Sequence, residues 1–212
     1  MENKEIIENL FKKTTRSNNI HDAVLFVENS KGDFSVNCGY GGKDINSPIF
    51  MASVAKLFVT SCILILEEQK KLSLDDLAGK YIDETILNGL HIYKGNEYSH
   101  KLTISDLLFQ TSGLAEGLGF FIKSATEDDI EVTFEAVIEK TKTLRPHFIP
   151  NTTGKAYYSD TNFRLLVCII ENITEKPISK AFLDYICNPL DMVNTYLPTK
   201  DDDIIPTVYY KT

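Results

Sequence analysis

Several features that mark specialised protein classes are missing from this 212-residue sequence. The longest apolar run, around "LFVTSCILIL", is much shorter than the ~20 residues that a helix needs to cross a bilayer. The N-terminal "MENKEIIENLFKKTTRSNN" lacks the basic start and apolar core of a signal peptide. We therefore expect a soluble, cytoplasmic protein without a membrane span, unless a leader has been removed.

Basic stripes and metal-ligand spacings are also missing. The formal net charge is −8, which disfavours nucleic-acid binding. The four cysteines (Cys38, Cys62, Cys168 and Cys187) form no CxxC or zinc-like pattern, and the four histidines are scattered. We expect no metal, no cofactor and no nucleic-acid partner. Cys62 and Cys168 lie in apolar helical runs, so they are predicted to be ordinary buried thiols.

The residues that are present indicate an α+β protein. Apolar residues at helical spacing predict an amphipathic N-terminal helix, and "DAVLFVENSKGDFSVNCGYG" predicts a β-hairpin. A helix from Ser53 to about Gln69, several further helices and a final β-like "IIPTVYYKT" follow. We group the chain into residues 1–60 (the N-terminal part of an α/β layer), 61–195 (a mainly helical region) and 196–212 (a return toward that layer), as a single, incomplete structural unit.

Capping signals refine the helical region. Ser73 is a candidate cap for a short helix through Leu77. Thr103 is a candidate N-cap with Asp106 at the capping-box position, and Gly113 is a candidate stop signal. The stretch "EDDIEVTFEAVIEKTKTL" is amphipathic and predicted to be helical, whereas "RPHFIPNTTGKAYYSD" is predicted to be irregular. An isolated hairpin is a poor sheet, so further strands are missing or come from another chain, which would permit self-association.

The stretch "SVAK" places a hydroxyl and an amine on one face of the predicted helix. Ser53 and Lys56 are three residues apart, so their side chains can meet. The unpaired amides at a helix N-terminus stabilise negative charge, and both the dipole and burial favour a neutral amine that can act as a base. A serine becomes a useful nucleophile when such a base is adjacent. The alternative is an ordinary N-cap at Ser53 and a solvated Lys56.

A second stretch, "GKAYYSDTNF", places Tyr158 and Asp160 two residues apart in an extended segment before a helix. Alternate residues of an extended chain point the same way, so a phenol and a carboxylate could converge on Lys56. The alternative is a tyrosine in the core, with Ser159 or Asp160 as the helix N-cap.

Together with two further segments, these stretches resemble the superfamily of serine β-lactamases and penicillin-binding proteins, in its class C β-lactamase and esterase-like branch. The matching segments are "MASVAKLF", "LTISDLLFQTSGL", "YYSDTNFRLL" and "NPLDMVNTYLP", in the order of that family. The resemblance implies a β-lactamase/transpeptidase-like fold. It also implies that Ser53 is the acylated nucleophile, Lys56 the general base or proton relay, Tyr158 a second acid–base group and Asp160 a substrate-binding residue.

Three positions depart from the family pattern. Asp160 replaces the usual asparagine, and an ionised aspartate accepts hydrogen bonds only and holds Lys56 protonated more firmly. Gln110 stands where histidine is common, and Asp191 where glycine is common. The family's third motif, Lys/His-Thr/Ser-Gly on a later strand, has no counterpart after Tyr158. We therefore expect a truncated chain that lacks the C-terminal sheet strands and is inactive or slow by itself.

The resemblance predicts a serine hydrolase that forms an acyl-enzyme on an amide, ester or β-lactam carbonyl of a small molecule or peptide. A β-lactamase, a DD-peptidase and an esterase remain open. The alternative is a non-catalytic binding or sensor module that recognises penicillins, or an inactive fragment. Phe120 and Phe121 either line a pocket or pack in the core.

Overall fold

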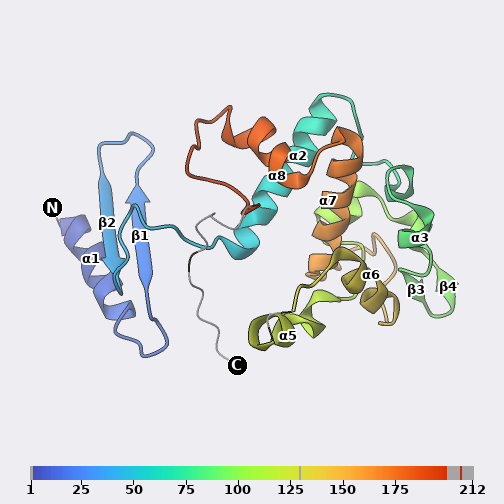
Figure 1. Ribbon diagram of the computed structural model, residues 1–212, viewed down its shortest axis with the longest axis horizontal. Helices are drawn as coiled ribbons and strands as arrows, with labels where there is room; N and C mark the ends of the chain where they lie inside the picture. Colours follow the sequence, from blue (N-terminus) through green and yellow to red (C-terminus); the bar gives the residue numbers. More distant parts are fainter. Residues whose placement is uncertain (1, 129, 200–205, 207–212) are drawn as a thin grey trace. The chain divides into compact units, whose positions relative to one another are not determined.

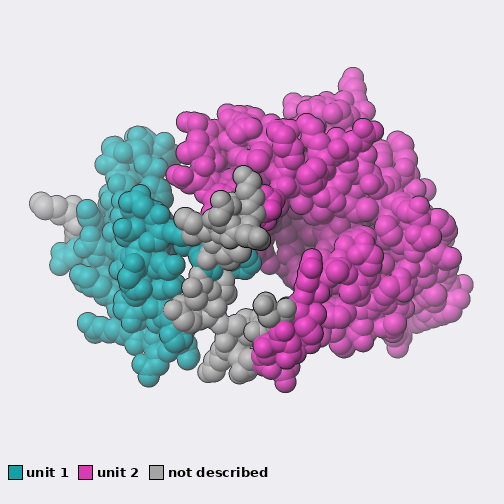
Figure 2. All heavy atoms as spheres, in the orientation of Figure 1, with its two compact units in different colours: residues 1–50, 202–211 teal, residues 51–201, 212 magenta. Residues whose placement is uncertain are grey.

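The computed structural model describes residues 2–128, 130–199 and 206. The chain divides into two compact units (Figure 2). Unit 1 contains residues 1–50 together with a C-terminal stretch, and unit 2 contains residues 51–201. The candidate site residues Ser53, Lys56, Tyr158 and Asp160 all belong to unit 2.

Among its described residues, unit 1 contains one helix and one hairpin (Figure 1). Helix α1 (Glu2–Thr14) packs against strand β2 (Ser35–Tyr40). Strand β2 pairs antiparallel with β1 (Ala23–Glu28), and Ala23 lies opposite Tyr40. The predicted helix and hairpin are therefore confirmed. The β-like segment expected at 204–212 lies outside the described residues, except for Pro206.

Unit 2 is mainly helical, with one short hairpin among the described residues. Its elements, in chain order, are the 3-10 turn η1 (Ala52–Val54), α2 (Ala55–Glu68), η2 (Ala78–Lys80), α3 (Glu84–Leu87), β3 (Ile92–Tyr93), β4 (Asn96–Glu97), η3 (Ser99–Lys101), α4 (Ile104–Leu108), η4 (Leu118–Phe120), α5 (Ile122–Glu127), α6 (Phe134–Lys142), α7 (Asp160–Thr174), α8 (Ile178–Phe182) and the π-helical turn η5 (Leu183–Cys187).

The core of unit 2 is built where α2 and α4 pack against α7 (Figure 1). Branched apolar side chains such as Ile63 on α2, Leu107 on α4 and Ile169 on α7 are completely buried there. Burying each such side chain contributes about 1.5–3 kcal/mol. This packing fixes η1, which carries Ser53, and the start of α2, which carries Lys56, relative to α7, which begins at Asp160.

The prediction of a short helix from Ser73 to Leu77 is wrong. The backbone of this stretch instead bonds to a distant segment: the Leu74 carbonyl accepts from the Ser105 N–H at 2.8 Å, and the Asp76 carbonyl accepts from the Ile104 N–H at 3.0 Å. These long-range bonds take carbonyls that a local helix would need. Helical geometry starts only at Ala78, in η2.

Other helix boundaries follow local capping. The capping box of Thr103 and Asp106 at the start of α4 is confirmed. Gly113, by contrast, does not end this helix, because α4 ends at Leu108. Gly113 adopts φ +74°, and a Cβ there would lie 2.1 Å from the Phe148 carbonyl oxygen, so glycine allows these two segments of the chain to approach closely.

The helix predicted over 127–144 is shorter than expected. Helix α6 begins only at Phe134, where the Thr133 side chain accepts from the Ala136 N–H. Of the two cysteines predicted to be buried, Cys62 is fully buried and Cys168 is only partly buried, and both are free thiols.

Candidate active site

Ser53 lies in the turn η1, which leads directly into α2. The preceding residue, Ala52, has φ +45°, a left-handed conformation that is unusual for a residue with a Cβ. Such strained residues cluster at functional sites, where the surrounding structure holds them in place. The side chains at the start of η1 and α2 provide no cap, so the chain presents the serine hydroxyl at an open helix start.

Lys56 follows one turn later, in the first turn of α2. Its Nζ donates a hydrogen bond to Ser53 Oγ at 3.2 Å. The side chain is only 19% exposed, and its Nζ lies over the rings of Tyr158 and Phe163, 5.0 and 5.6 Å from their centroids. The ammonium is therefore held between aromatic faces and directed at the serine.

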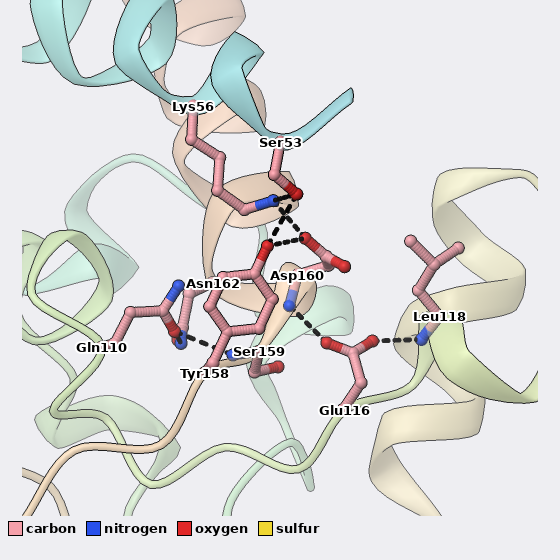
Figure 3. A network of polar contacts seen from close by, with 9 residues as sticks. All are labelled: Ser53, Lys56, Gln110, Glu116, Leu118, Tyr158, Ser159, Asp160 and Asn162. Carbon is pink, nitrogen blue, oxygen red and sulfur yellow. Dashed lines mark hydrogen bonds and ion pairs between the residues drawn. The ribbon is translucent and has the colours of Figure 1, made fainter. Parts of the chain in front are cut away.

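Tyr158 and Asp160 complete the cluster, as Figure 3 shows. Tyr158 Oη lies 2.9 Å from Ser53 Oγ and donates to Asp160 Oδ1 at 3.2 Å. Asp160 also forms an ion pair with Lys56. The extended conformation of the intervening Ser159 (φ −142°, ψ 125°) explains why Tyr158 and Asp160 point the same way. The structure thus brings together all four residues that the sequence singled out.

The ordinary structural roles considered for these residues are not seen. Tyr158 is 54% exposed, so it is not a core tyrosine. Ser159 occupies the N-cap position of α7 without capping it, because its hydroxyl donates to the Ala115 carbonyl at 3.0 Å.

The chemistry of these groups fixes which atom donates and which accepts in each hydrogen bond of the cluster. A protonated lysine only donates and a carboxylate only accepts, so Lys56 donates to Ser53 Oγ and Tyr158 donates its one proton to Asp160. Tyr158 Oη is then left to accept the proton of Ser53. The resting serine hydroxyl therefore points its proton at the phenol, with the ammonium behind the serine oxygen.

The pKa of Lys56 is raised above its usual value. Burial lowers this pKa, but the hydrogen bonds to Asp160 and Tyr158 and the attraction to the Asp160 carboxylate raise it by more. This is the direction expected from an aspartate at position 160. Lys56 is therefore an ammonium at neutral pH.

Gln110 supports the Tyr158–Asp160 segment, a role that the sequence did not reveal. Its Oε1 accepts hydrogen bonds from the Ser159 N–H at 2.9 Å and from the Asn162 side-chain amide. Its backbone has φ +61° and accepts from the Tyr157 N–H at 2.9 Å. Asn162 is in turn bonded to Ser112 Oγ at 2.7 Å. Hydrogen bonds from the segment "QTSGL" therefore hold the backbone that carries Tyr158 and Asp160 in position.

Glu116 is a second residue that sequence reasoning missed. Its Oε1 accepts from the Leu118 N–H at 2.6 Å and its Oε2 accepts from the Asp160 N–H, the first amide of α7 (Figure 3). A carboxylate at a helix N-terminus is stabilised by the free amides and the helix dipole. Glu116 therefore caps α7 from a distant loop. No local pattern could show this, because the two residues are far apart in sequence.

Phe120 is 58% exposed and lies under Lys140 Nζ, 4.1 Å from its ring centroid, so it does not pack in the core. Asp191 has φ +53°, a left-handed conformation that glycine adopts without steric cost, so it fits the resemblance's expectation of glycine at this position. An apolar cavity beside α2 contains none of the four cluster residues; it is lined by Met51, Ala55, Phe58, Ser179, Phe182, Leu183, Cys187, Thr195, Tyr196 and Leu197.

Over the described parts of the chain, no group of three or more His, Cys, Asp or Glu side chains is arranged to hold a metal ion. In the same parts, every helix is too short or too polar to span a bilayer.

Comparison with known proteins gives consistent matches. A family model described as Beta-lactamase matches residues 36–211. Protein flp of Staphylococcus aureus (strain MW2) is 27% identical over 182 residues, which cover 82% of this chain and 34% of that protein. The chain therefore spans about a third of the length of this curated relative.

Solved structures show the same fold. A D-stereospecific amidohydrolase from Streptomyces sp. has a TM-score of 0.66 at 23% identity, covering 82% of this chain and 50% of that one. The octameric penicillin-binding protein homologue from Pyrococcus abyssi has a TM-score of 0.68 at 20% identity, covering 89% and 43%. These likenesses confirm the expected α+β, β-lactamase/transpeptidase-like fold.

Proposed function

Because this chain belongs to the beta-lactamase family, we propose that it is the part of a serine hydrolase that carries the nucleophile, and that Ser53 forms an acyl-enzyme with an amide, ester or β-lactam carbonyl. One observation supports this proposal most directly. Ser53 Oγ lies within hydrogen-bond distance of both Lys56 Nζ, at 3.2 Å, and Tyr158 Oη, at 2.9 Å. A serine hydroxyl becomes a useful nucleophile when a group that can accept its proton lies beside it, and here an amine and a phenol both do.

In the proposed acylation, Ser53 Oγ attacks the carbonyl carbon and a new Oγ–C bond forms. The serine proton passes directly to the neutral Lys56 Nζ, or to Tyr158 Oη while the phenol gives its own proton to Lys56 Nζ. A protonated ammonium has no lone pair, so Lys56 must first lose a proton before it can accept this one. The reactive form is therefore the one with a neutral Lys56, and the backbone amide of Ser53 in η1 helps stabilise the oxyanion.

In the second half, Tyr158 passes a proton to the leaving amine or alcohol as the C–N or C–O bond breaks. Water then attacks the acyl-enzyme and gives its proton back through the same groups, which releases the acid and restores the Ser53 hydroxyl. Asp160 contributes by holding Lys56 and Tyr158 and by contacting substrate. No metal or cofactor enters this scheme.

The proposal is tested by labelling Ser53. Incubation with a fluorophosphonate or a penicillin, followed by intact mass measurement, should show one adduct that is absent from Ser53→Ala. A matched control, Ser61→Ala, alters an exposed serine elsewhere on α2 and should label like the unmodified chain. Equal labelling of Ser53→Ala and the unmodified chain would remove Ser53 as the nucleophile.

A second function, a sensor that is acylated without turnover, is favoured by one observation. The raised pKa of Lys56 reduces the neutral amine available to activate water after acylation. A stable adduct with one equivalent of product released would support the sensor. Many equivalents released per chain, with nitrocefin or a nitrophenyl ester, would support the hydrolase.

We also propose a cytoplasmic location and self-association through the sheet of unit 1, which has only two strands among its described residues. Size-exclusion chromatography with light scattering tests the second point. A monomer at all concentrations would contradict it.

A further inference from the structure

Two carboxylates, those of Glu116 and Asp160, lie at the start of α7. They differ in whether both oxygens accept a hydrogen bond from the described residues. Both oxygens of Glu116 accept backbone N–H groups, those of Leu118 and Asp160. Asp160, by contrast, engages both Lys56 and Tyr158 through Oδ1. Within the described part of the chain, Asp160 Oδ2 accepts no hydrogen bond. The side chain is 28% exposed, so this oxygen is accessible to a ligand.

The spare oxygen is well placed relative to the nucleophile. Figure 3 shows that it points away from Lys56, toward the side on which Leu118 lies. Tyr158 Oη contacts both Ser53 Oγ and Asp160 Oδ1, at 2.9 and 3.2 Å, so the serine and the carboxylate are separated by only two hydrogen bonds. A substituent one or two carbons from the carbonyl of an acyl group on Ser53 would therefore come within reach of Asp160.

We propose that Asp160 selects substrates whose acyl group carries a protonated amine close to the scissile carbonyl, which are esters or amides of amino acids with a free amino group, by binding that ammonium through Oδ2. The proposal rests on the proposed function, because it needs the acyl group to be attached to Ser53. An asparagine at this position would present a neutral amide, whereas an ionised aspartate offers a negative charge and acceptors only.

The expected preference for a substrate with an ammonium depends on the strength of its hydrogen bond to Asp160 and on the charges nearby. Hydrogen bonds between an ammonium and a carboxylate are about twice as strong as neutral ones. Glu116 adds negative charge beside Asp160, and the net charge of −8 attracts cations. Lys56 and Arg164, whose charges act on Asp160, oppose a further cation. We therefore expect a preference of about tenfold to a hundredfold, the range for a hydrogen bond to a charged group.

The experiment compares three thiobenzyl esters with the 212-residue chain: those of alanine, N-acetylalanine and propionic acid. The first has an ammonium, the second a neutral amide N–H and the third no donor. Release of the thiol gives the second-order acylation rate with each ester whether or not the adduct accumulates. The rate with Ser53→Ala is subtracted, and intact mass locates the adduct.

The proposal predicts that the alanine ester reacts about tenfold to a hundredfold faster than the other two, and that Asp160→Asn reduces this ratio to about one. Because the readout is a ratio, a general loss of reactivity in the variant does not affect it. Asp75→Asn removes one charge at an exposed site of unit 2 and should keep the ratio of the unmodified chain.

Three other results are informative. Equal rates with the three esters, or a preference that survives in Asp160→Asn, would overturn the ammonium site and leave the acyl-enzyme proposal intact. A preference lost in Asp75→Asn as well would assign it to overall charge and also overturn the site. Thiol release that is the same in Ser53→Ala would instead reject the proposed function.

Discussion

Three helices of unit 2 begin in three different ways, and the contrast shows what surrounds the candidate nucleophile. Helix α4 is capped by its own residues, Thr103 and Asp106. Helix α7 is capped by Glu116 from a distant loop. Helix α2 continues directly from η1, which carries the candidate nucleophile Ser53, and neither element has a side-chain cap. Because a cap would occupy the amides that stabilise negative charge, an open start suits a nucleophile and a closed start suits a packed helix.

The largest effect should come from the open start of α2. Replacing the base, Lys56→Met, removes the amine that contacts Ser53 Oγ, and we expect acylation to slow by about 10²–10⁴-fold. The rate of thiol release measures this. Lys71→Met, which alters an exposed lysine just after α2, should keep the rate of the unmodified chain. A Lys56→Met rate within a few-fold of the unmodified chain would contradict the role of Lys56.

Loss of the cap should have different effects on acylation at helix α7 and at helix α4. Glu116→Ala and Thr103→Ala each remove a cap and should lower the free energy of unfolding by about 1 kcal/mol. Only Glu116→Ala should also slow acylation, by about tenfold or more, because it frees the segment that holds Tyr158 and Asp160. Urea unfolding and thiol release, measured on both variants, give the two quantities. Similar acylation rates in the two variants would show that the cap of α7 is structural only.

The pH dependence of acylation sharpens the role of Asp160. The raised pKa of Lys56 means that the neutral amine forms only at alkaline pH, so acylation should still be rising at about pH 9. Asp160→Asn removes the carboxylate that raises this pKa, so the rise should move to lower pH. A profile that stays in place would show that Asp160 does not control the protonation of Lys56.

The same ion pair has a consequence for stability. The pKa of Lys56 is higher in the folded chain than in the unfolded chain, so its protonation adds to the free energy of unfolding. This stabilisation is fully present below the unfolded pKa of about 10.4. It is lost as the pH rises through the pKa of the folded chain. Asp160→Asn should therefore be less stable than the unmodified chain at neutral pH, and the difference should narrow at alkaline pH. Thermal unfolding at several pH values tests this, and a constant difference would contradict it.

The smallest effect concerns the strain at Ala52. A left-handed alanine costs roughly 1–2 kcal/mol, and glycine removes this cost but loses more backbone entropy on folding. Ala52→Gly should therefore stabilise the chain by about 0.5 kcal/mol, measured by urea unfolding, with little change in acylation. Gly42→Ala gives the opposite test: φ is +84° in an open site, so the added Cβ should destabilise. Destabilisation of Ala52→Gly would show that no strain is stored there.

Much of the fold was predictable because its signals are local. Helix α1 and the hairpin follow from hydrophobic spacing and turn residues, and the capping box at Thr103 follows from side chains three residues apart. The helix predicted from Ser73 to Leu77 was wrong because the carbonyls of Leu74 and Asp76 bond to the distant segment at Ile104 and Ser105. No local pattern contains that competition.

The sequence by itself determined which chemical groups this chain could use: a serine and a lysine one helical turn apart, and a phenol and a carboxylate on one side of an extended segment. Only the tertiary structure decided that these two pairs meet, because the contact depends on how α2 packs against α7. It also decided which residues hold them, since Gln110 and Glu116 act on segments more than forty residues away. Local spacing sets the orientation of neighbouring side chains, whereas contacts between distant segments depend on packing of the whole core.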